Sequence, residues 1–360
     1  MSLLHDPDEP IWQRLLLSPL APAAGLFGAA AGARRTLFRR GVLPSAKAPL
    51  PVISVGNLAV GGAGKTPVTI HLVQQLQRRG LRVAVLSRGY GGKGRGARVV
   101  SRGEGLLLDA RDAGDEPVLV ARRCPGALVL VGAERAELAR IAARHLRADV
   151  AVLDDGFQHL ALARDLDIVV LDGAAPFGNG KLLPRGPLRE KPAALARAHL
   201  GWIAKCDEGA PELLDGAERE IRARTGKPAV RSRYRVSRVL GADLRTERPL
   251  AALDGAQVLL LAGVARPASF RRTLERAGAR VVDEALFGDH HAFTRRQVEG
   301  VLARARAVGA ELVCCTEKDA VRLPPELHGG ERLVAVQVET EIVAGAELLA
   351  AELARVVGGA

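Results

Sequence analysis

A glycine-rich segment, GNLAVGGAGKTP at residues 56–67, carries the clearest chemistry in this sequence. It follows the apolar run 51–55 and precedes residues 66–79, in which apolar side chains recur at helical spacing. Backbone N–H groups of such a strand–loop–helix turn bind phosphate oxygens, and the helix N-terminus adds a favourable dipole. A lysine at its end reaches the β- and γ-phosphates, and the next hydroxyl ligates Mg²⁺. We therefore predict a site for ATP and Mg²⁺ at Gly61, Gly62, Ala63, Gly64, Lys65 and Thr66.

This loop departs from the G-x-x-x-x-G-K-[ST] pattern at one position, where Ala59 stands in place of glycine. Gly61 and Gly62 supply the flexibility instead. A second pattern, G-x-G-x-x-G at residues 89–94, follows the predicted strand 82–87. A dinucleotide site would need a helix to begin there, whereas residues 95–100 are expected to be extended, which excludes that reading. The first loop predicts nucleotide binding but leaves the reaction open.

Two adjacent carboxylates, Asp154 and Asp155, come directly after the apolar run 150–153. A buried strand that ends in aspartates is the arrangement that holds Mg²⁺ or its water shell in phosphate-loop enzymes. The alternative is a pair of solvated turn residues. We expect the metal role because the preceding run is fully apolar.

Asp115, in the segment GDEP at 114–117, has two possible roles. It suits the N-cap of a helix, with Pro117 in the first turn. It also suits a general base that accepts a hydroxyl proton. The sequence alone favours the cap, and both roles together require a side chain that is exposed in a cleft.

A further candidate group is Asp289 with the adjacent His290 and His291. Two histidines can bind a metal, but no third ligand stands at a convincing spacing. A histidine paired with an aspartate across a cleft would strengthen a general base. Loop histidines without a chemical role are the remaining alternative.

Composition narrows the class of protein. The 360 residues are 48% hydrophobic and 26% charged, which predicts real hydrophobic cores, and the net charge is +12. That charge attracts anionic lipid, nucleic acid or phosphorylated ligands. Aromatic residues make up only 3%, which argues against stacking platforms for single-stranded nucleic acid. The four cysteines form no C-x-x-C pair, so we expect buried thiols in a reducing compartment, without disulfides or zinc.

The elements that must position these groups alternate between short apolar strands and helices. Expected strands lie at 51–55, 82–87, 128–131, 150–153 and 168–171, with helices at 66–79 and 133–145. This alternation predicts an α/β fold with a mostly parallel sheet covered by helices on both faces. Residues 173–192 interrupt it with four Gly and four Pro, as a long functional loop or a domain boundary does.

Beyond that loop a second α/β set is expected. Its strands lie near 202, 230–236, 258–262, 281–283 and 312–314, with helices at 267–277 and 344–357. We therefore divide the chain into an N-terminal helix and linker (1–44), a nucleotide-binding core domain (45–172), a smaller C-terminal domain (173–335) and a tail that packs back on the core (336–360).

Residues 15–33 carry no charge and are followed by Arg34, Arg35, Arg39 and Arg40. Their length approaches the roughly 20 residues that a helix needs to cross a bilayer. Pro19 and Pro22 weaken the pattern. Two readings stand: a transmembrane or monotopic helix with its basic end at the cytoplasmic face, or a helix that packs on the globular body.

These segments together resemble the tetraacyldisaccharide 4′-kinases, the lipid A 4′-kinases of Gram-negative bacteria. The matching stretches are, in order, GNLAVGGAGKTP (56–67), LSRGYGG (86–92), GDEP (114–117), DDGFQHL (154–160), RDLDIVVLD (164–172), GNGKLLPRGPLRE (178–190), GDHHAFT (288–294) and TEKDAVR (316–322). The Ala59 departure fits as well, since the loop of this family is of the GGxGKTP type.

The resemblance implies transfer of the γ-phosphate of ATP to the 4′-hydroxyl of a tetraacylated glucosamine disaccharide 1-phosphate, with Mg²⁺. It implies a phosphate-loop core domain, a smaller C-terminal domain and an N-terminal helix at the cytoplasmic face of the inner membrane. The expected partners are this glycolipid and the membrane surface, without nucleic acid, and we expect a monomer.

Carried over residue by residue, the resemblance makes Asp115 the catalytic base, in partnership with His290. It makes Lys65 and Thr66 the nucleotide and metal residues, and Asp154 and Asp155 the carboxylates on the metal side. Four further residues fall in stretches expected to line the cleft and contact substrate: Tyr90, Glu116, Arg185 and Arg189.

A competing hypothesis is a phosphate-loop GTPase or ATPase that acts as a switch or metal-insertion factor. It predicts nucleotide hydrolysis without an acceptor. The sequence has no evident Asn-Lys-x-Asp segment for reading guanine, which counts against a GTPase. A nucleic-acid-binding ATPase would rest on the +12 charge alone.

Overall fold

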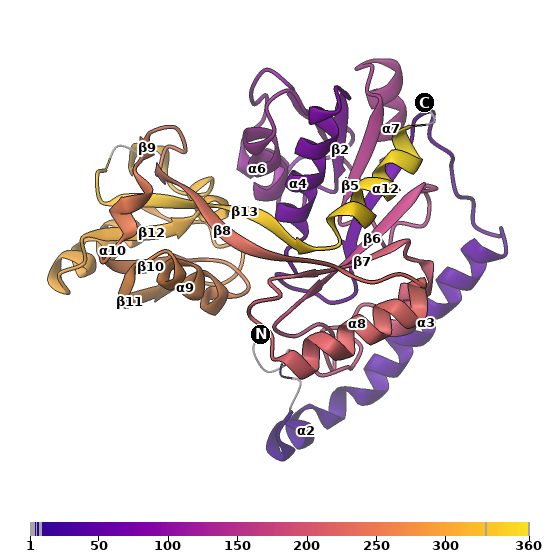
Figure 1. The fold of residues 1–360 in the computed structure, drawn as a ribbon, viewed down its shortest axis with the longest axis horizontal. Helices are drawn as coiled ribbons and strands as arrows, with labels where there is room; N and C mark the ends of the chain where they lie inside the picture. The colour runs from indigo at the N-terminus through magenta and orange to yellow at the C-terminus, as the bar shows by residue number, and fades with distance from the viewer. Residues whose placement is uncertain (1–3, 5, 7–8, 328–329, 359–360) are drawn as a thin grey trace.

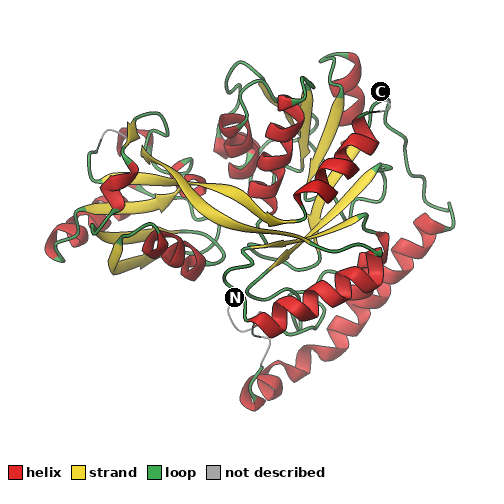
Figure 2. Cartoon of the chain, viewed as in Figure 1, coloured by secondary structure: helices red, strands yellow, loops and turns green. Residues whose placement is uncertain are grey.

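The computed structural model describes residues 4, 6, 9–327 and 330–358, and one sheet runs through all of this part of the chain. Its strand order is β11-β10-β12-β13-β8-β7-β6-β1-β5-β2-β4-β3. Figure 1 shows two lobes of unequal size, and Figure 2 shows the helices that flank the sheet in each. The expected α/β fold with a mostly parallel sheet is confirmed.

The larger lobe is built around β1, Val52–Asn57, which pairs in parallel with β5 on one side and β6 on the other. These strands are buried on both faces, as expected for apolar runs beneath helices. The other strands of this lobe are β2 (Val83–Ser87), β3 (Arg98–Arg102), β4 (Leu128–Val131), β5 (Val150–Asp154), β6 (Leu166–Asp172) and β7 (Leu200–Ala204).

Helices cover both faces of this part of the sheet. Three of them share one apolar core: α4 (Lys65–Arg78), α6 (Asp115–Arg123) and α12 (Ala346–Val357). On the opposite face lie α7 (Arg135–Arg144) and α8 (Pro211–Thr225). The short α5 (Ala110–Ala113) precedes α6.

The smaller lobe is also built from parallel strands flanked by helices. Its parallel strands are β10 (Gln257–Ala262), β11 (Arg280–Leu286) and β12 (Leu312–Thr316). Its helices are α9 (Pro267–Arg276), α10 (Arg295–Ala307) and the short α11 (Glu317–Ala320). The two-residue strand β9 (Glu247–Arg248) pairs with β8.

Two long antiparallel strands join the lobes: β8 (Val230–Gly241) and β13 (Leu333–Ala344). Each begins in one lobe and ends in the other, as Figure 1 shows.

The expected domain boundary at residue 173 is wrong. β7 pairs with β6 over five residues, and the helix α8 packs against the sheet of the larger lobe. The Gly- and Pro-rich segment 173–192 is thus an excursion within the larger lobe, because the apolar strand after it returns to the same sheet. The smaller lobe begins only where β8 leaves the core.

The N-terminal apolar stretch forms α2 (Ile11–Leu17), the 3₁₀ turn Ser18–Leu20 and α3 (Ala21–Arg39). Pro19 and Pro22 each lie in a first turn, where a missing N–H costs nothing. Taken together, Ile11–Arg39 is long and apolar enough to cross a membrane, and little of it is buried.

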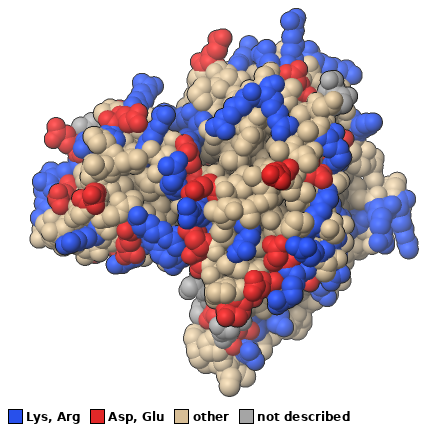
Figure 3. Space-filling model, in the orientation of Figure 1, with Lys and Arg blue, Asp and Glu red and all other residues tan. Residues whose placement is uncertain are grey.

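One side of α3 does contact the larger lobe. Arg35 forms an ion pair with Glu190 at 2.8 Å, and Arg34 donates to the carbonyl of Gln158. Several large apolar residues remain exposed, among them Ile11, Trp12, Leu15, Leu16 and Leu26. In Figure 3 the end of the molecule formed by α2 is largely uncharged, as that exposure requires.

Candidate active site

The phosphate loop connects β1 to α4 at the carboxyl edge of the sheet. Gly64 is the N-cap of α4 and has φ 89°, a left-handed conformation that favours glycine. Gly56 is required for a different reason, because a Cβ there would lie 2.5 Å from the Cβ of Phe157. The loop is held from outside by the segment 187–189, where Val60 donates to Pro187 and Arg189 donates to Leu58.

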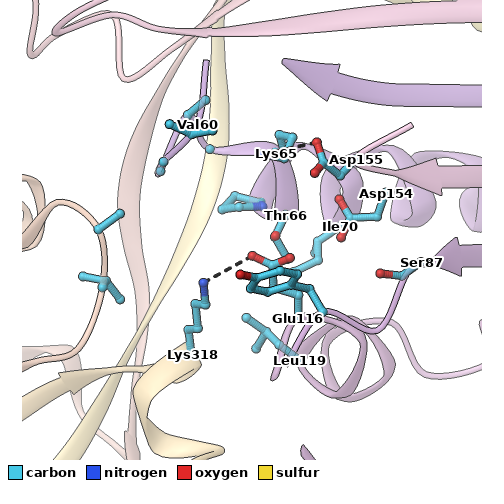
Figure 4. A pocket seen from close by; sticks show the side chains of 18 of the residues that line it. Val60, Lys65, Thr66, Ile70, Ser87, Glu116, Leu119, Asp154, Asp155 and Lys318 are labelled. Atoms are coloured by element: carbon cyan, nitrogen blue, oxygen red, sulfur yellow. Dashed lines mark hydrogen bonds and ion pairs between the residues drawn. The ribbon is translucent and has the colours of Figure 1, made fainter. Parts of the chain in front are cut away.

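Lys65 faces Asp155 across the loop, with 3.6 Å between Nζ and Oδ1 (Figure 4). Arg189 contacts the other oxygen of the same carboxylate at 2.9 Å. Burial would raise the pKa of Asp155, but these two cations lower it below its usual value. Asp155 also has φ 57°, an uncommon conformation for a non-glycine residue that often marks a functional site.

Asp154 lies beside it at the end of β5 and accepts a hydrogen bond from Thr69 at 3.2 Å. Burial, together with the nearby charge of Glu116, raises the pKa of Asp154 to about 7. The two adjacent aspartates are therefore in opposite electrostatic environments.

The oxygens at this edge suit Mg²⁺. Thr66, Asp154 and Asp155 offer only hydroxyl and carboxylate donors, and Oδ1 of Asp155 is buried without a hydrogen-bond partner. Among the described residues no three His, Cys, Asp or Glu side chains cluster as a dedicated metal cage. Mg²⁺ is commonly held by one or two carboxylates plus substrate phosphates, so the donor set fits.

Asp115 and His290 meet between the lobes. Nδ1 of His290 lies 3.0 Å and 3.2 Å from the two carboxylate oxygens of Asp115. The capping role expected for Asp115 is wrong: Gly114 is the N-cap of α6, and Asp115 is its first residue. Within α6 the carboxylate accepts a hydrogen bond from the adjacent N–H of Glu116, and it faces His290 of the smaller lobe.

The charges around this pair favour an ionised carboxylate. Burial opposes ionisation of Asp115, but the His290 hydrogen bond and the charges of Lys318 and Arg322 lower its pKa. The same hydrogen bond raises the pKa of His290, against the effect of burial. His290 has φ 60°, a further left-handed residue at this site.

His291 is turned away from the pair. Its ring stacks on Phe287, and Nε2 lies 3.1 Å from the amide oxygen of Gln297. Of the two histidines, His290 is therefore the one that faces the larger lobe.

Lys318 is a site residue that the sequence reasoning missed. Its Nζ lies 3.2 Å from Glu116, 3.7 Å from Asp289 and 3.4 Å from Nε2 of His290. Figure 4 shows it pointing at Glu116 from the smaller lobe. Arg322 approaches Asp115 at 3.5 Å from the same side. Both fall in the quoted segment 316–322, so that segment was the available signal.

A cleft of about 1530 Å³ connects these groups. The predicted substrate residues Tyr90, Glu116 and Arg189 line it, as do Lys65, Thr66 and His290. The expectation that Arg185 lines it is wrong, because its guanidinium is buried in a two-bond ion pair with Glu9. The cleft continues to α3, where Phe27, Ala30 and Arg34 form part of its wall.

A basic cluster that the sequence reasoning also missed surrounds His159 in this wall. Burial and the charges of four arginines lower the pKa of His159 to about 4, and the four are Arg135, Arg164, Arg34 and Arg88. Three of them, Arg34, Arg88 and Arg135, line the cleft. Such a concentration of positive charge suits an anionic group.

The sheet topology, the phosphate loop and the carboxylates at its edge define an enzyme of the phosphate-loop kinase class. A family model described as tetraacyldisaccharide-1-P 4′-kinase matches residues 16–357. The chain belongs to this family, and it is a kinase.

Similar proteins and one solved structure support the same family assignment. The chain is 52% identical to the tetraacyldisaccharide 4′-kinase of Anaeromyxobacter dehalogenans strain 2CP-C, over 96% of this chain and 94% of that one. It is 43% identical to the protein of that name from Syntrophotalea carbinolica, over 86% and 84% of the two chains. The crystal structure of LpxK from Aquifex aeolicus in complex with ATP matches with a TM-score of 0.75 and 31% identity, covering 95% of this chain and 99% of that one.

Proposed function

We propose that this chain transfers the γ-phosphate of ATP to the 4′-hydroxyl of a tetraacylated glucosamine disaccharide 1-phosphate. The observation that carries the proposal is the Asp115–His290 pair, with 3.0 Å between Nδ1 and the nearer carboxylate oxygen, beside the cleft that the phosphate loop also lines. A carboxylate at this point can accept the proton of an alcohol acceptor as its oxygen attacks the γ-phosphate.

In this mechanism Asp115 accepts the proton of the sugar hydroxyl. Its lowered pKa keeps it ionised near neutral pH, and the raised pKa of His290 favours the protonated imidazole. The hydrogen bond from His290 then orients the carboxylate. Lys318 adds a positive charge near the attacking oxygen and holds Glu116 in the cleft wall.

On the donor side, the backbone of residues 61–64 binds the phosphates of ATP and Lys65 reaches the β- and γ-oxygens. Thr66, Asp154 and Asp155 would hold Mg²⁺, which neutralises charge on those oxygens when bound. Arg189 shares Asp155 with Lys65, so it orients that carboxylate.

The acceptor end of the cleft suits a phosphorylated, acylated sugar. Arg34, Arg88 and Arg135 supply positive charge for a phosphate, and Tyr90 adds an exposed ring. The same cleft reaches α3, whose apolar residues suit acyl chains. The acyl chains then stay in a lipid layer while the sugar reaches the phosphate loop.

This arrangement requires work at a membrane surface. We infer that α2 and α3 dock on the inner membrane from its cytoplasmic side, with Arg34, Arg35, Arg39 and Arg40 near anionic head groups. We propose that a monomer suffices, because all the groups used here come from one chain.

The test is phosphotransfer by the purified full chain. ATP labelled at the γ-position, Mg²⁺ and the disaccharide 1-phosphate in detergent micelles should yield a labelled glycolipid. Asp115→Asn should lower kcat by about 100-fold or more, the usual contribution of a general base. Asp112→Asn, the same change at an exposed residue of α5, should leave the rate unchanged. Folded protein that hydrolyses ATP but labels no glycolipid would overturn the proposal in favour of an NTPase.

A further inference from the structure

Three charged side chains that this mechanism does not use meet beside the phosphate loop: Lys205, Asp172 and Arg266. Nζ of Lys205 lies 2.7 Å from Oδ2 of Asp172, and Nε of Arg266 lies 2.9 Å from the same oxygen. The side chains of Lys205 and Asp172 are only 3% and 5% exposed. Burying charged groups costs desolvation free energy unless they are fully paired, so a buried cluster of this kind suggests a functional role.

Lys205 also holds the phosphate loop directly. Its ammonium donates to the carbonyl of Gly62 at 2.9 Å. A loop that binds phosphate must direct N–H groups toward the anion and keep carbonyls away from it. The carbonyl of Gly62 is fixed by Lys205 and so cannot turn toward the phosphates. Lys205 follows β7 with φ 52°, so it keeps this contact from a strained backbone.

Arg266 brings the second lobe into the cluster. It lies between β10 and α9 of the smaller lobe, whereas Asp172 is the last residue of β6 in the larger lobe. Its neighbour Ala265 approaches the loop as well, at 3.6 Å from a Cβ built on Gly62. The loop carbonyl, the buried lysine, the shared carboxylate and the other lobe therefore form one continuous chain of contacts.

We propose that Lys205, Asp172 and Arg266 are positioning residues that make the ATP-binding form of the phosphate loop depend on contact with the smaller lobe. Arg266 fixes Asp172, Asp172 fixes Lys205, and Lys205 fixes the Gly62 carbonyl. This inference rests on the proposed function for its ATP site, and it deepens that function by naming how the site is set.

The experiment measures ATP affinity calorimetrically on the full chain with Mg²⁺ and no acceptor. Lys205→Met and Arg266→Ala should each raise the Kd for ATP by about tenfold, the effect of losing one charged hydrogen bond. The double variant should bind no more weakly than the worse single one, because both changes break the same chain of contacts. Arg266→Lys should recover most of the affinity, since an ammonium can still reach Asp172.

The matched control is Arg276→Ala, which removes an exposed ion pair between α9 and Asp207 across the same lobes but away from the loop. Its Kd should stay within about twofold of the parent protein. Thermal melting of each variant checks folding, and Arg266, whose side chain is 22% exposed, is the variant expected to fold in any case.

Parent-like ATP affinity of Arg266→Ala would overturn the proposal, and so would independent, multiplicative effects of the two single changes. Because no acceptor is present, this result is separate from the proposed function. A chain that shows the coupling but labels no glycolipid would overturn that function and leave the coupling standing.

Discussion

At the scale of single residues, two carboxylates of one cleft have pKa values pushed in opposite directions. Asp115 is ionised because His290, Lys318 and Arg322 offset its burial. Asp154 has its pKa raised to about 7 by burial and by the charge of Glu116. When the pKa values of two carboxylates in one site are shifted apart, the two groups can perform different tasks. These opposite shifts are consistent with the proposed roles, a general base for Asp115 and a ligand of a cation for Asp154.

The Asp115–His290 contact predicts a pH-dependent stability. A raised His290 pKa adds stability that is fully present below about pH 6.5 and is lost as the pH rises through the raised value. The lowered pKa of Asp115 adds stability that is lost only at acidic pH. The groups that face the imidazole are Asp115, Asp289 and Lys318.

His290→Gln should therefore cost about 1 kcal/mol more at pH 6 than at pH 9, the size expected of a partly exposed ion pair. Urea unfolding at the two pH values measures the difference. In an Asp115→Asn background the same change should lose this pH dependence. Equal destabilisation at both pH values would show that the imidazole is not charged in the folded protein.

At the scale of elements, the junction of β1 with the phosphate loop requires glycine at position 56, where there is no room for a side chain. A Cβ at Gly56 would lie 2.5 Å from the Cβ and 2.7 Å from the backbone nitrogen of Phe157. Phe157 is fully buried and follows Asp154 and Asp155 closely in the chain, so it cannot move without moving them. The strand that feeds the phosphate loop and the turn that carries Asp155 are thus packed against each other.

Gly56→Ala should lower the free energy of unfolding by about 1–3 kcal/mol, as overpacking does. Gly62→Ala is the matched control, because a Cβ there meets its nearest neighbour at 3.6 Å, an ordinary contact. Thermal melting compares the two variants. A melting temperature of Gly56→Ala equal to that of Gly62→Ala would contradict the close-packed junction.

At the scale of the whole molecule, one end is apolar and the cleft opens toward it. Exposed side chains of α2 and α3, such as Trp12, Leu16 and Leu26, have no covering element among the described residues. The basic residues at 34–40 form the C-terminal end of α3 and its cap. This distribution suits a lipid surface, and the proposed function has the helix present the cleft to such a surface.

Replacing Leu16 and Leu26 together by Ser should weaken binding to vesicles that contain anionic phospholipid by about 100-fold, since each buried leucine contributes about 1.5–3 kcal/mol. Vesicle co-sedimentation gives the partition coefficient. Leu250→Ser removes an exposed leucine, 47% accessible, from the smaller lobe and should change nothing. Undiminished binding of the double variant would mean that α2 and α3 do not carry the membrane contact.

Short sequence patterns are enough to predict the elements that form locally. The phosphate loop, the strand that ends in Asp154 and Asp155, and the helices α4 and α7 follow from patterns within about 15 residues, because hydrogen bonds and periodic burial act over that range. The order of short segments was enough to identify the family. Prolines 19 and 22 could be accommodated in first turns, which left the apolar helix intact.

The contacts between the two lobes could not be predicted from such patterns, because they depend on how the lobes pack together. Asp115 and His290 are 175 positions apart, and Glu116 and Lys318 are 202 apart. These contacts form only because β8 and β13 bring the lobes together, and the pKa shifts of Asp115 and His290 follow from them. Arg185 was assigned to substrate by its segment, yet burial with Glu9 took it out of the cleft. Sequence patterns report which side chains a segment carries, whereas charge pairing over long range depends on how the packed elements are placed.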